Sequence, residues 1–476
     1  MKKIYMSFAL ILSTFILATS CSDFLDEASR EKVETEDQEV YTPQQILTGV
    51  YGMFNDWTYG FAYLGVTEII SDNADKGSSS TDTGTDKDVL DALTFTTSCE
   101  SIRDIWGYWY TSIGRATQSI EYTQGFGLND KTLESRLIGE AKFLRALNYF
   151  YLVRGWGEVP IQDQDITVRA SVEDVYAYIE ADLLDAIDKL PLRSQYNAND
   201  LGRATKGAAQ GLLAKVYLYQ KKWQNAYDYA ELVVQSGEYE LIRNYIDVFK
   251  SDAQYHNSKE SIFEFQAKGA DGSMAHSVRQ YSASQGARGD TGWGWGFNTP
   301  SQSLLNAFNE AGDNIRRDAT IIFRNSTLYD GRVVGSTENS MYNYKAYSSS
   351  APAADWNDRF LCYMRYAEIL LIKAEAANEL NNNSIALAAL KEVRDRVELP
   401  EITTTDQSAL RQAIWKERRL ELAMEHDRWF DIIRTGQAKD AMTADGKPFI
   451  VGKHELFPIP NNQLIQIPNL GQNPQW

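Results

Sequence analysis

Apolar residues recur three and four positions apart along much of the chain, and this spacing predicts amphipathic helices. The clearest case covers residues 136–154. A second helix is expected from Ser171, a capping residue, to Pro191, which cannot continue a helix. Another begins at Thr42 and Pro43, a cap followed by proline at the first helical position. The pattern therefore predicts an all-α fold.

Two stretches share the spacing of a tetratricopeptide-type helical hairpin, in which small residues let two antiparallel helices approach closely. The first two positions of each set are 12 residues apart, but the sets are separated by 160 residues, so the hairpins are not a tandem array. The matching positions are Ala214, Ala226 and Ala230 in the first stretch, and Ala374, Ala386 and Leu390 in the second.

Three stretches lack helical periodicity and are expected to lie on this helical scaffold. Residues from about 243 to 356 are rich in Gly, Ser, Asn and aromatic residues, which predicts a large loop-rich insertion. Within it, residues 259–266 alternate like a short strand. Residues 71–91 are expected to form a long surface loop, and residues 455–476 an extended strap on the surface.

The first 20 residues resemble a bacterial lipoprotein signal peptide: a positive start and an apolar run precede small residues and Cys21. The resemblance implies cleavage before Cys21 and a diacylglycerol anchor on its sulfur. Ordinary secretion with an incidental cysteine is the alternative. Residues 21–40 are polar and acidic and predict a flexible tether, and residues 41–476 are expected to form a single domain.

Composition narrows the classes of partner. The net charge of -18 repels a phosphate backbone, so no nucleic-acid partner is expected. The 27 Tyr and 11 Trp are numerous for a globular chain and point to a use for flat rings with polar edges. Cys99 and Cys362 are compatible either with a disulfide or with two buried thiols.

Motifs of catalysis are missing from the sequence. It contains no phosphate-binding loop, no GxSxG elbow and no HExxH or CxxC motif, and its four His residues are isolated, so no zinc site is expected. The Asp-rich segment from Asp72 to Asp91 offers oxygen ligands for calcium, but a solvated acidic loop is favoured. No carboxylate pair stands out for glycoside hydrolysis. The pattern favours a protein that is not an enzyme and needs no cofactor.

Aromatic residues in polar, loop-like surroundings are the best candidates for a binding site. A sugar ring stacks its C–H face on Trp or Tyr, while polar groups bind its hydroxyls. The alternative for each ring is packing against the scaffold. The candidate ligand contacts are Trp57, Tyr59, Tyr63, Asp72, Asn73, Tyr281, Trp293, Trp295, Tyr329 and Trp356.

The most charged stretch, residues 418–436, looks like an active site but is interpreted as scaffold. As one continuous helix it places opposite charges three and four positions apart in two ladders, with His426 facing the bundle as a packed core residue and Gly436 capping the end. The ladder residues are Arg418, Glu421, Glu425 and Arg428 in the first, and Asp427, Asp431 and Arg434 in the second.

Several stretches, occurring in the order expected of the family, resemble the SusD/RagB family of outer-membrane lipoproteins. They include SDNAD (71–75), IWGYWYTSIGRA (105–116), GEAKFLRALNYFYLVRGWGEVP (139–160), GWGFNTPSQSLLNAF (294–308), RYAEILLIKAEAANEL (365–380) and the charged stretch with its preceding glutamate, ERRLELAMEHDRWFDIIRTG (417–436).

The resemblance implies a scaffold of about four tetratricopeptide-like hairpins that carries a loop-rich ligand-binding region. It also implies a non-catalytic, lipid-anchored protein on the outer face of the outer membrane, which binds oligosaccharide and delivers it to a TonB-dependent SusC-like transporter. Two alternatives stay open: an adaptor of the same transporter that binds a peptide or glycopeptide, and a glycoside hydrolase.

Overall fold

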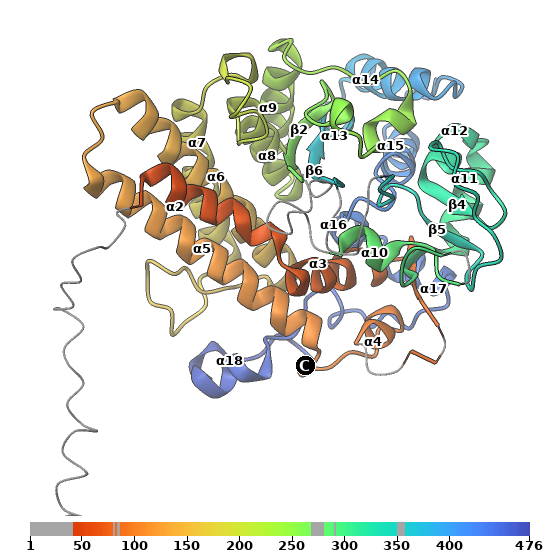
Figure 1. The fold of residues 1–476 in the computed structure, drawn as a ribbon, viewed down its shortest axis with the longest axis horizontal. Helices are drawn as coiled ribbons and strands as arrows, with labels where there is room; N and C mark the ends of the chain where they lie inside the picture. Colours follow the sequence, from red (N-terminus) through yellow and green to blue (C-terminus); the bar gives the residue numbers. More distant parts are fainter. Residues whose placement is uncertain (1–40, 80, 83–85, 268–279, 290–291, 350–357) are drawn as a thin grey trace, which may run out of the picture. The chain divides into compact units, whose positions relative to one another are not determined.

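Helices joined by short turns make up most of the described chain in this computed structural model (Figure 1). The structure describes residues 41–79, 81–82, 86–267, 280–289, 292–349 and 358–476. Pro43–Trp476 form one compact unit. The predicted signal peptide, the tether with Cys21, and Trp356 lie outside the described residues. The prediction of an all-α fold is confirmed.

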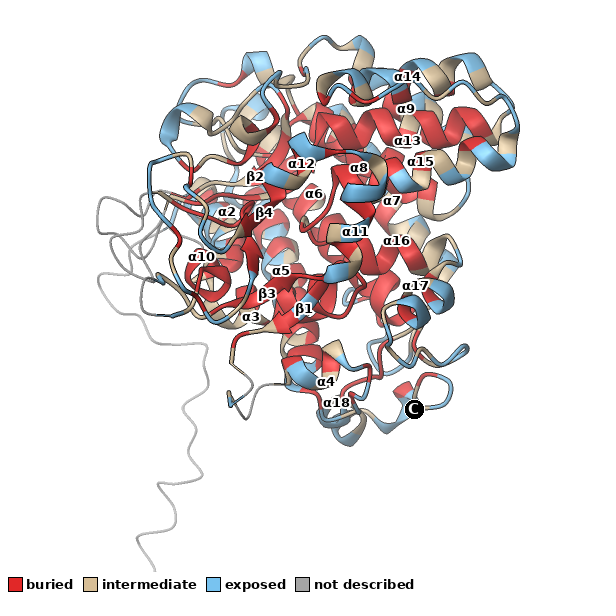
Figure 2. Cartoon of the chain, turned by 90° about the vertical axis from the view of Figure 1, so that its right-hand side faces the viewer, coloured by how far each residue is buried: buried red, intermediate tan, exposed pale blue. Residues whose placement is uncertain are grey.

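The scaffold is built from helices that pack on their neighbours in sequence, and α9 also packs on the distant α13. Figure 2 shows that α13 is buried over most of its length, as the burial of its side chains requires. The scaffold helices are α2 (Pro43–Tyr51), α3 (Trp57–Leu64), α5 (Glu100–Phe126), α6 (Lys131–Trp156), α7 (Val172–Lys189), α8 (Lys206–Tyr219), α9 (Trp223–Gln235), α13 (Tyr366–Glu379), α14 (Asn383–Arg396) and α15 (Gln407–Glu421).

The start signals and hairpins predicted from the sequence are present. Ser171 caps α7 by accepting a hydrogen bond from the Asp174 N–H at 3.1 Å. The pairs α8–α9 and α13–α14 occupy the two predicted hairpins and pack together. All six residues at the matching positions are at most 1% exposed, as close helix contact demands. The helix pairs are confirmed, and their assignment to the tetratricopeptide class stays a prediction.

The insertion carries most of the short strands. Within the described residues, three two-stranded antiparallel sheets form, which pair β1 with β3, β2 with β6, and β4 with β5. The strand expected within residues 259–266 is β2. The elements are β1 (Ala74–Gly77), β2 (Ser261–Phe265), α10 (Tyr281–Gln285), β3 (Phe297–Pro300), α11 (Gln302–Ala311), α12 (Asn314–Thr320), β4 (Ile321–Phe323), β5 (Met341–Asn343) and β6 (Leu361–Arg365).

Two segments predicted as irregular are more ordered than expected. Residues 71–91 contain β1 and α4 (Lys87–Asp91) instead of one surface loop, because β1 pairs with the insertion strand β3. The tail contains α18 (Asn461–Gln466) and a 3₁₀ turn (Pro468–Leu470) instead of an extended strap. None of the described helices combines the length and the apolarity needed to cross a membrane.

The charged stretch 418–436 is not one helix, so that prediction is wrong. Helix α15 ends at Glu421 and α16 (Arg428–Arg434) begins after a break, in which Met424 and His426 have left-handed φ angles of 63° and 71°. Gly436, with φ of 72°, follows the end of α16, as predicted.

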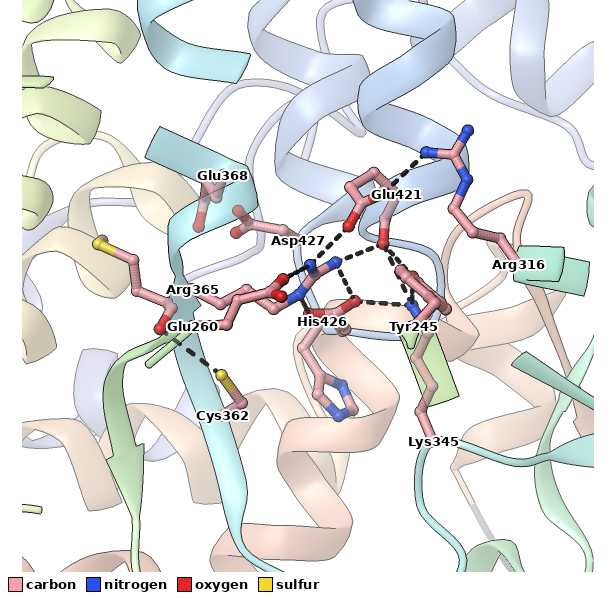
Figure 3. A network of polar contacts seen from close by, with 12 residues as sticks. Tyr245, Glu260, Arg316, Lys345, Cys362, Arg365, Glu368, Glu421, His426 and Asp427 are labelled. Carbon is pink, nitrogen blue, oxygen red and sulfur yellow. Dashed lines mark hydrogen bonds and ion pairs between the residues drawn. The ribbon is translucent and has the colours of Figure 1, made fainter. Parts of the chain in front are cut away.

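Of the predicted ladders, the pair of Asp431 with Arg434 is present at 2.7 Å. Glu421 and Glu425 instead form ion pairs with other elements (Figure 3). Arg365 of β6 contacts Glu421 at 2.6 Å, Glu425 at 2.7 Å and Glu260 at 2.7 Å, and Lys345 of the insertion contacts Glu425 at 2.7 Å. Glu421 is the last residue of α15 and Glu425 lies in the break between α15 and α16, and both contact Arg365. The network therefore connects the insertion to the scaffold.

His426 is the packed core residue that the sequence predicts. Its side chain is 1% exposed, and its ring nitrogens contact the hydroxyls of Tyr281 (2.6 Å) and Thr67 (3.1 Å). Burial lowers the pKa of His426 to about 3, so the ring is neutral at physiological pH. Cys99 and Cys362 are both free thiols, which excludes the disulfide alternative.

Candidate functional site

Three of the predicted aromatic contacts belong to the core. Tyr59, Tyr63 and Tyr281 are 2%, 2% and 5% exposed, and burial raises the pKa of each phenol above its ordinary value. We therefore remove them from the candidate site, because no ligand can stack on a ring that is covered by protein. Their hydroxyl partners are Tyr363 for Tyr59 (2.7 Å), Tyr151 for Tyr63 (2.8 Å) and His426 for Tyr281 (2.6 Å).

Asp72 and Asn73 are also internal and act as braces. Asp72 is 1% exposed and accepts two hydrogen bonds from Arg428, at 2.8 and 2.9 Å. Burial raises the pKa of Asp72, but the charges of Arg428 and Arg419 lower it more, so the net shift is strongly downward. Asn73 accepts a hydrogen bond from Arg419 at 2.9 Å. Both residues tie the start of the N-terminal loop to α15 and α16.

Trp57 and Trp295 meet in a group of rings that we call the ring cluster: the half-buried Trp57, Phe61 and Trp295 and the buried Phe297. Trp57 stacks on Phe61 of the same helix with 4.5 Å between centroids, and the edge of Trp295 meets Trp57 at 5.5 Å. Phe297 meets Phe61 edge to face at 5.1 Å. Trp57, Phe61 and Trp295 keep partial exposure, so part of the cluster faces solvent.

The pairing of β1 with β3 brings the two halves of the ring cluster together. Gly77 lies opposite Phe297 in this ladder and has a left-handed φ of 67°. A Cβ atom at Gly77 would lie 2.3 Å from the carbonyl oxygen of Gly296, a contact that side chains do not make. Only glycine fits at this position.

We expect Gly77→Ala to lower the free energy of unfolding by about 2 kcal/mol, because it adds backbone strain and a clash with Gly296. Urea denaturation followed by circular dichroism measures the change. Gly49→Ala is the control: Gly49 lies in α2 with open space around it, so alanine there should leave stability unchanged or raise it slightly. Equal effects of both variants would contradict the assigned role of Gly77.

A polar rim borders the turn that carries Trp295. Arg288 pairs with Asp82 at 2.6 Å and with Glu338 at 3.1 Å, and these three side chains are 30%, 33% and 44% exposed. The Asn339 side chain donates to the Ser78 carbonyl at 3.1 Å and lies beside Gly296. The rim therefore offers both donors and acceptors next to half-exposed rings.

Trp293 and Tyr329 belong to a second group of rings, the tyrosine cluster: Trp293, Tyr329, Tyr344 and Tyr347. Tyr329 stacks on Tyr344 with 5.8 Å between centroids, and Trp293 meets Tyr347 edge to face at 5.3 Å. Arg332 covers the Trp293 ring at 4.9 Å. A guanidinium and another ring therefore already contact Trp293 within the protein.

The glycines around Trp293 and Trp295 allow a close backbone approach, as their pattern predicts. The partner is α10 of the same chain: the Trp295 N–H donates to the Ala283 carbonyl at 2.8 Å. A Cβ atom at Gly294 would lie 2.4 Å from that carbonyl oxygen. The turn is thereby held rigidly in place, with Trp295 directed to Trp57.

Sequence reasoning missed Phe61, Phe297, Arg288 and Glu338. A signal for Phe61 existed, because it lies four residues after Trp57 and shares its face once the segment is helical. Phe297 follows Trp295 by two residues in the same aromatic stretch and pairs with Gly77 in the β1–β3 ladder. No local signal marked Arg288 and Glu338, which pair with each other across 50 residues of the chain.

The carboxylates of the Asp-rich segment do not converge on a common point. Within the described residues, no group of His, Cys, Asp and Glu is arranged to hold a metal ion. The calcium alternative thus has no support in this segment. The pairs are Asp72 with Arg428, Asp82 with Arg288, Asp86 with Lys87, Asp88 with Lys76, and Asp91 with Lys447.

Comparison with known sequences gives two matches to family profiles. Residues 322–476 match the SusD family, and residues 23–218 match a family described as starch-binding and associating with the outer membrane. SusD-like protein P2 of Formosa agariphila is 28% identical over 518 aligned residues, covering 99% of each chain. The chain belongs to the SusD-like family.

Solved structures of SusD-like proteins have the same fold. A laminarin-binding SusD-like protein aligns with a TM-score of 0.77 and 28% identity, over 91% of this chain and 99% of that one. A SusD homolog from Bacteroides thetaiotaomicron aligns with a TM-score of 0.78 and 26% identity, over 91% and 96%. The SusD-like scaffold is thus shared over nearly the whole described chain, insertion included.

Proposed function

We propose that this SusD-like protein is a lipid-anchored, cell-surface binder of oligosaccharide or polysaccharide, which delivers its ligand to a TonB-dependent SusC-like transporter in the outer membrane. Binding occurs by stacking of sugar rings on the ring cluster and by hydrogen bonds to the polar rim. No bond of the glycan is cleaved.

The observation that carries the proposal is the half-exposed contact of Trp57 with Trp295 beside Arg288, Asp82 and Glu338. An indole offers an apolar face to the C–H groups of a sugar, and the rim offers donors and acceptors to its hydroxyls. This combination suits a ligand that is apolar on its faces and polar around its edge.

The similar proteins support the same ligand class. One structural neighbour is named for laminarin binding, and one matching profile is described as starch-binding and associating with the outer membrane. The lipoprotein-like signal before Cys21 supports the lipid anchor. The match to the SusD family supports a SusC-like transporter as the partner. Laminarin and starch therefore belong in the first panel of ligands.

Calorimetric titration of the purified protein against laminarin, starch and other neutral glycans tests the proposal. Trp295→Ala should weaken binding at least about tenfold, because it removes one wall of the ring cluster. Trp223→Ala is the matched control, since Trp223 is also half-buried but lies at the start of α9. It should bind like the wild type.

Two results would contradict the proposal. No binding across the panel would favour the peptide-binding adaptor, above all if the protein still captured a SusC-like transporter. Release of reducing ends from a glycan by the purified protein would favour a glycoside hydrolase.

A further inference from the structure

A concave surface lies along α5, apart from the residues of the ring cluster. It has a cavity volume of about 540 Å³. We call it the α5 groove and describe it by six of its lining residues, Asp56, Arg103, Asp104, Gly107, Tyr108 and Arg115. None of these residues belongs to the ring cluster or to the polar rim.

Gly107 keeps the groove open. It lies in the interior of the 27-residue helix α5, where glycine destabilises a helix relative to alanine. Its φ angle is not left-handed, and a Cβ atom there would meet nothing within 4 Å. Neither backbone conformation nor close packing requires glycine at this position. The consequence of the missing side chain is space above α5.

Tyr108 forms an aromatic wall that is held in place from two sides. Its ring lies 6.1 Å from the core ring of Tyr59, and its hydroxyl lies on the side of Asp56, whose pKa it lowers. Burial raises the pKa of Asp56, but Tyr108 and the Thr58 N–H lower it more, so this group is a carboxylate at neutral pH. The ring is therefore ordered before any ligand arrives, which lowers the entropy cost of binding.

The charges that line the groove balance. Arg103 pairs with Asp104 at 2.7 Å, and Asp56 accepts the Thr58 N–H at 2.7 Å. Arg115 is exposed and has no hydrogen-bond or ion-pair partner among the residues that the structure describes. Two arginines and two aspartates suit an uncharged ligand with both donors and acceptors, and the net charge of -18 disfavours a polyanion.

We infer that the α5 groove is a second saccharide subsite, which takes an uncharged sugar with its ring face on Tyr108 and its hydroxyls on Arg115 and Asp56. The inference rests on the proposed function, because it assumes a glycan ligand. Helix α3 joins the two places: Trp57 belongs to the ring cluster, and the next residue, Thr58, lines the groove. One extended glycan chain can thus contact both.

Gly107→Gln tests this inference, because glutamine favours the helix and fills the groove. We expect the affinity for neutral hexasaccharides to fall at least about tenfold in calorimetric titration, while the thermal unfolding midpoint stays the same or rises. The probes are laminarihexaose, maltohexaose, cellohexaose, xylohexaose and mannohexaose. Gly125→Gln is the matched control: Gly125 lies in the same helix, also has open space around it, and is outside the groove.

Arg115→Gln is a second variant that leaves the core untouched, and it should weaken binding of the same hexasaccharide several-fold. If the wild type binds a hexasaccharide and both variants bind it equally well, the α5 groove is not a subsite, and the proposed function still stands. If the wild type binds none of the five probes, the α5 groove is not a subsite for neutral hexasaccharides; the proposed function fails as well only if laminarin, starch and the other glycans of its panel are also not bound.

Discussion

Arg365→Leu should lower the free energy of unfolding by about 3 kcal/mol, because it removes a buried cation from a network of ion pairs. Arg365 is 1% exposed and contacts Glu260, Glu421 and Glu425 at 2.6 to 2.7 Å. Leucine restores none of these contacts. Each of the three acids keeps another cation, Arg396 for Glu260 and Glu421 and Lys345 for Glu425, so the loss stays near the lower end of what breaking a buried ion pair costs. Urea denaturation measures it.

The control for this prediction is Arg411→Leu. Arg411 donates two hydrogen bonds to Glu379, at 2.5 and 2.6 Å, but its side chain is 27% exposed. Solvent screens this pair and hydrates the glutamate that is left behind, so the loss should be about 1 kcal/mol or less. Similar losses in the two variants would contradict the argument that burial makes Arg365 essential.

The network around Arg365 also explains why one continuous helix was wrongly predicted for residues 418–436. Their charges fit an exposed helix with ladders of opposite charge, and local spacing alone cannot distinguish that helix from a broken one. The partners of these charges in the folded protein, Arg365 and Lys345, come from distant parts of the chain. The scaffold helices were predictable because their periodicity is local. The break was not, because these partners are distant in sequence.

The candidate site shows the same division between local and long-range information. The aromatic character of the site was predictable from the sequence. Because residues 57–63 were predicted to form a loop, however, Trp57, Tyr59 and Tyr63 were all candidate ligand contacts. As helix α3, the segment places Trp57 and Phe61 on a half-exposed face, whereas Tyr59 and Tyr63 are buried. Which face of α3 is buried depends on β1, β3 and the turn that carries Trp295. No sequence pattern within α3 indicates how these distant elements pack on it.

Glu68→Gln should stabilise the protein, by an amount that grows as the pH rises. Glu68 lies in a short π-helix (Gly65–Ile69), is 0% exposed, and accepts the His426 N–H at 2.6 Å. Burial raises the pKa of Glu68 from 4.5 to about 8, against a smaller opposing effect of the His426 hydrogen bond. The unfolded chain therefore releases this proton at a lower pH than the folded protein does.

The sign follows from that difference. Below pH 4.5 Glu68 is protonated in both the folded and the unfolded state, so the folded protein keeps its full stability. As the pH rises from 4.5 toward 8, Glu68 ionises in the unfolded chain but stays protonated in the fold, and the free energy of unfolding decreases. Glutamine keeps an oxygen for the His426 N–H and does not ionise. The variant should exceed the wild type by about 3 kcal/mol at pH 7, and by little at pH 4.5, in urea denaturation at a series of pH values.

Asp72→Asn should change the free energy of unfolding in the opposite direction to Glu68→Gln, that is, it should destabilise the protein. Asp72 is also buried, four residues further along, but Arg428 and Arg419 hold its pKa far below the ordinary value. Its stabilising effect is present above pH 3.8 and is lost only as the pH falls through the lowered pKa. The substitution should therefore cost about 3–5 kcal/mol, nearly constant from about pH 5 to pH 8. A pH-independent effect of Glu68→Gln would show that Glu68 is ionised in the fold, since only the guanidinium partners distinguish these two carboxyl groups.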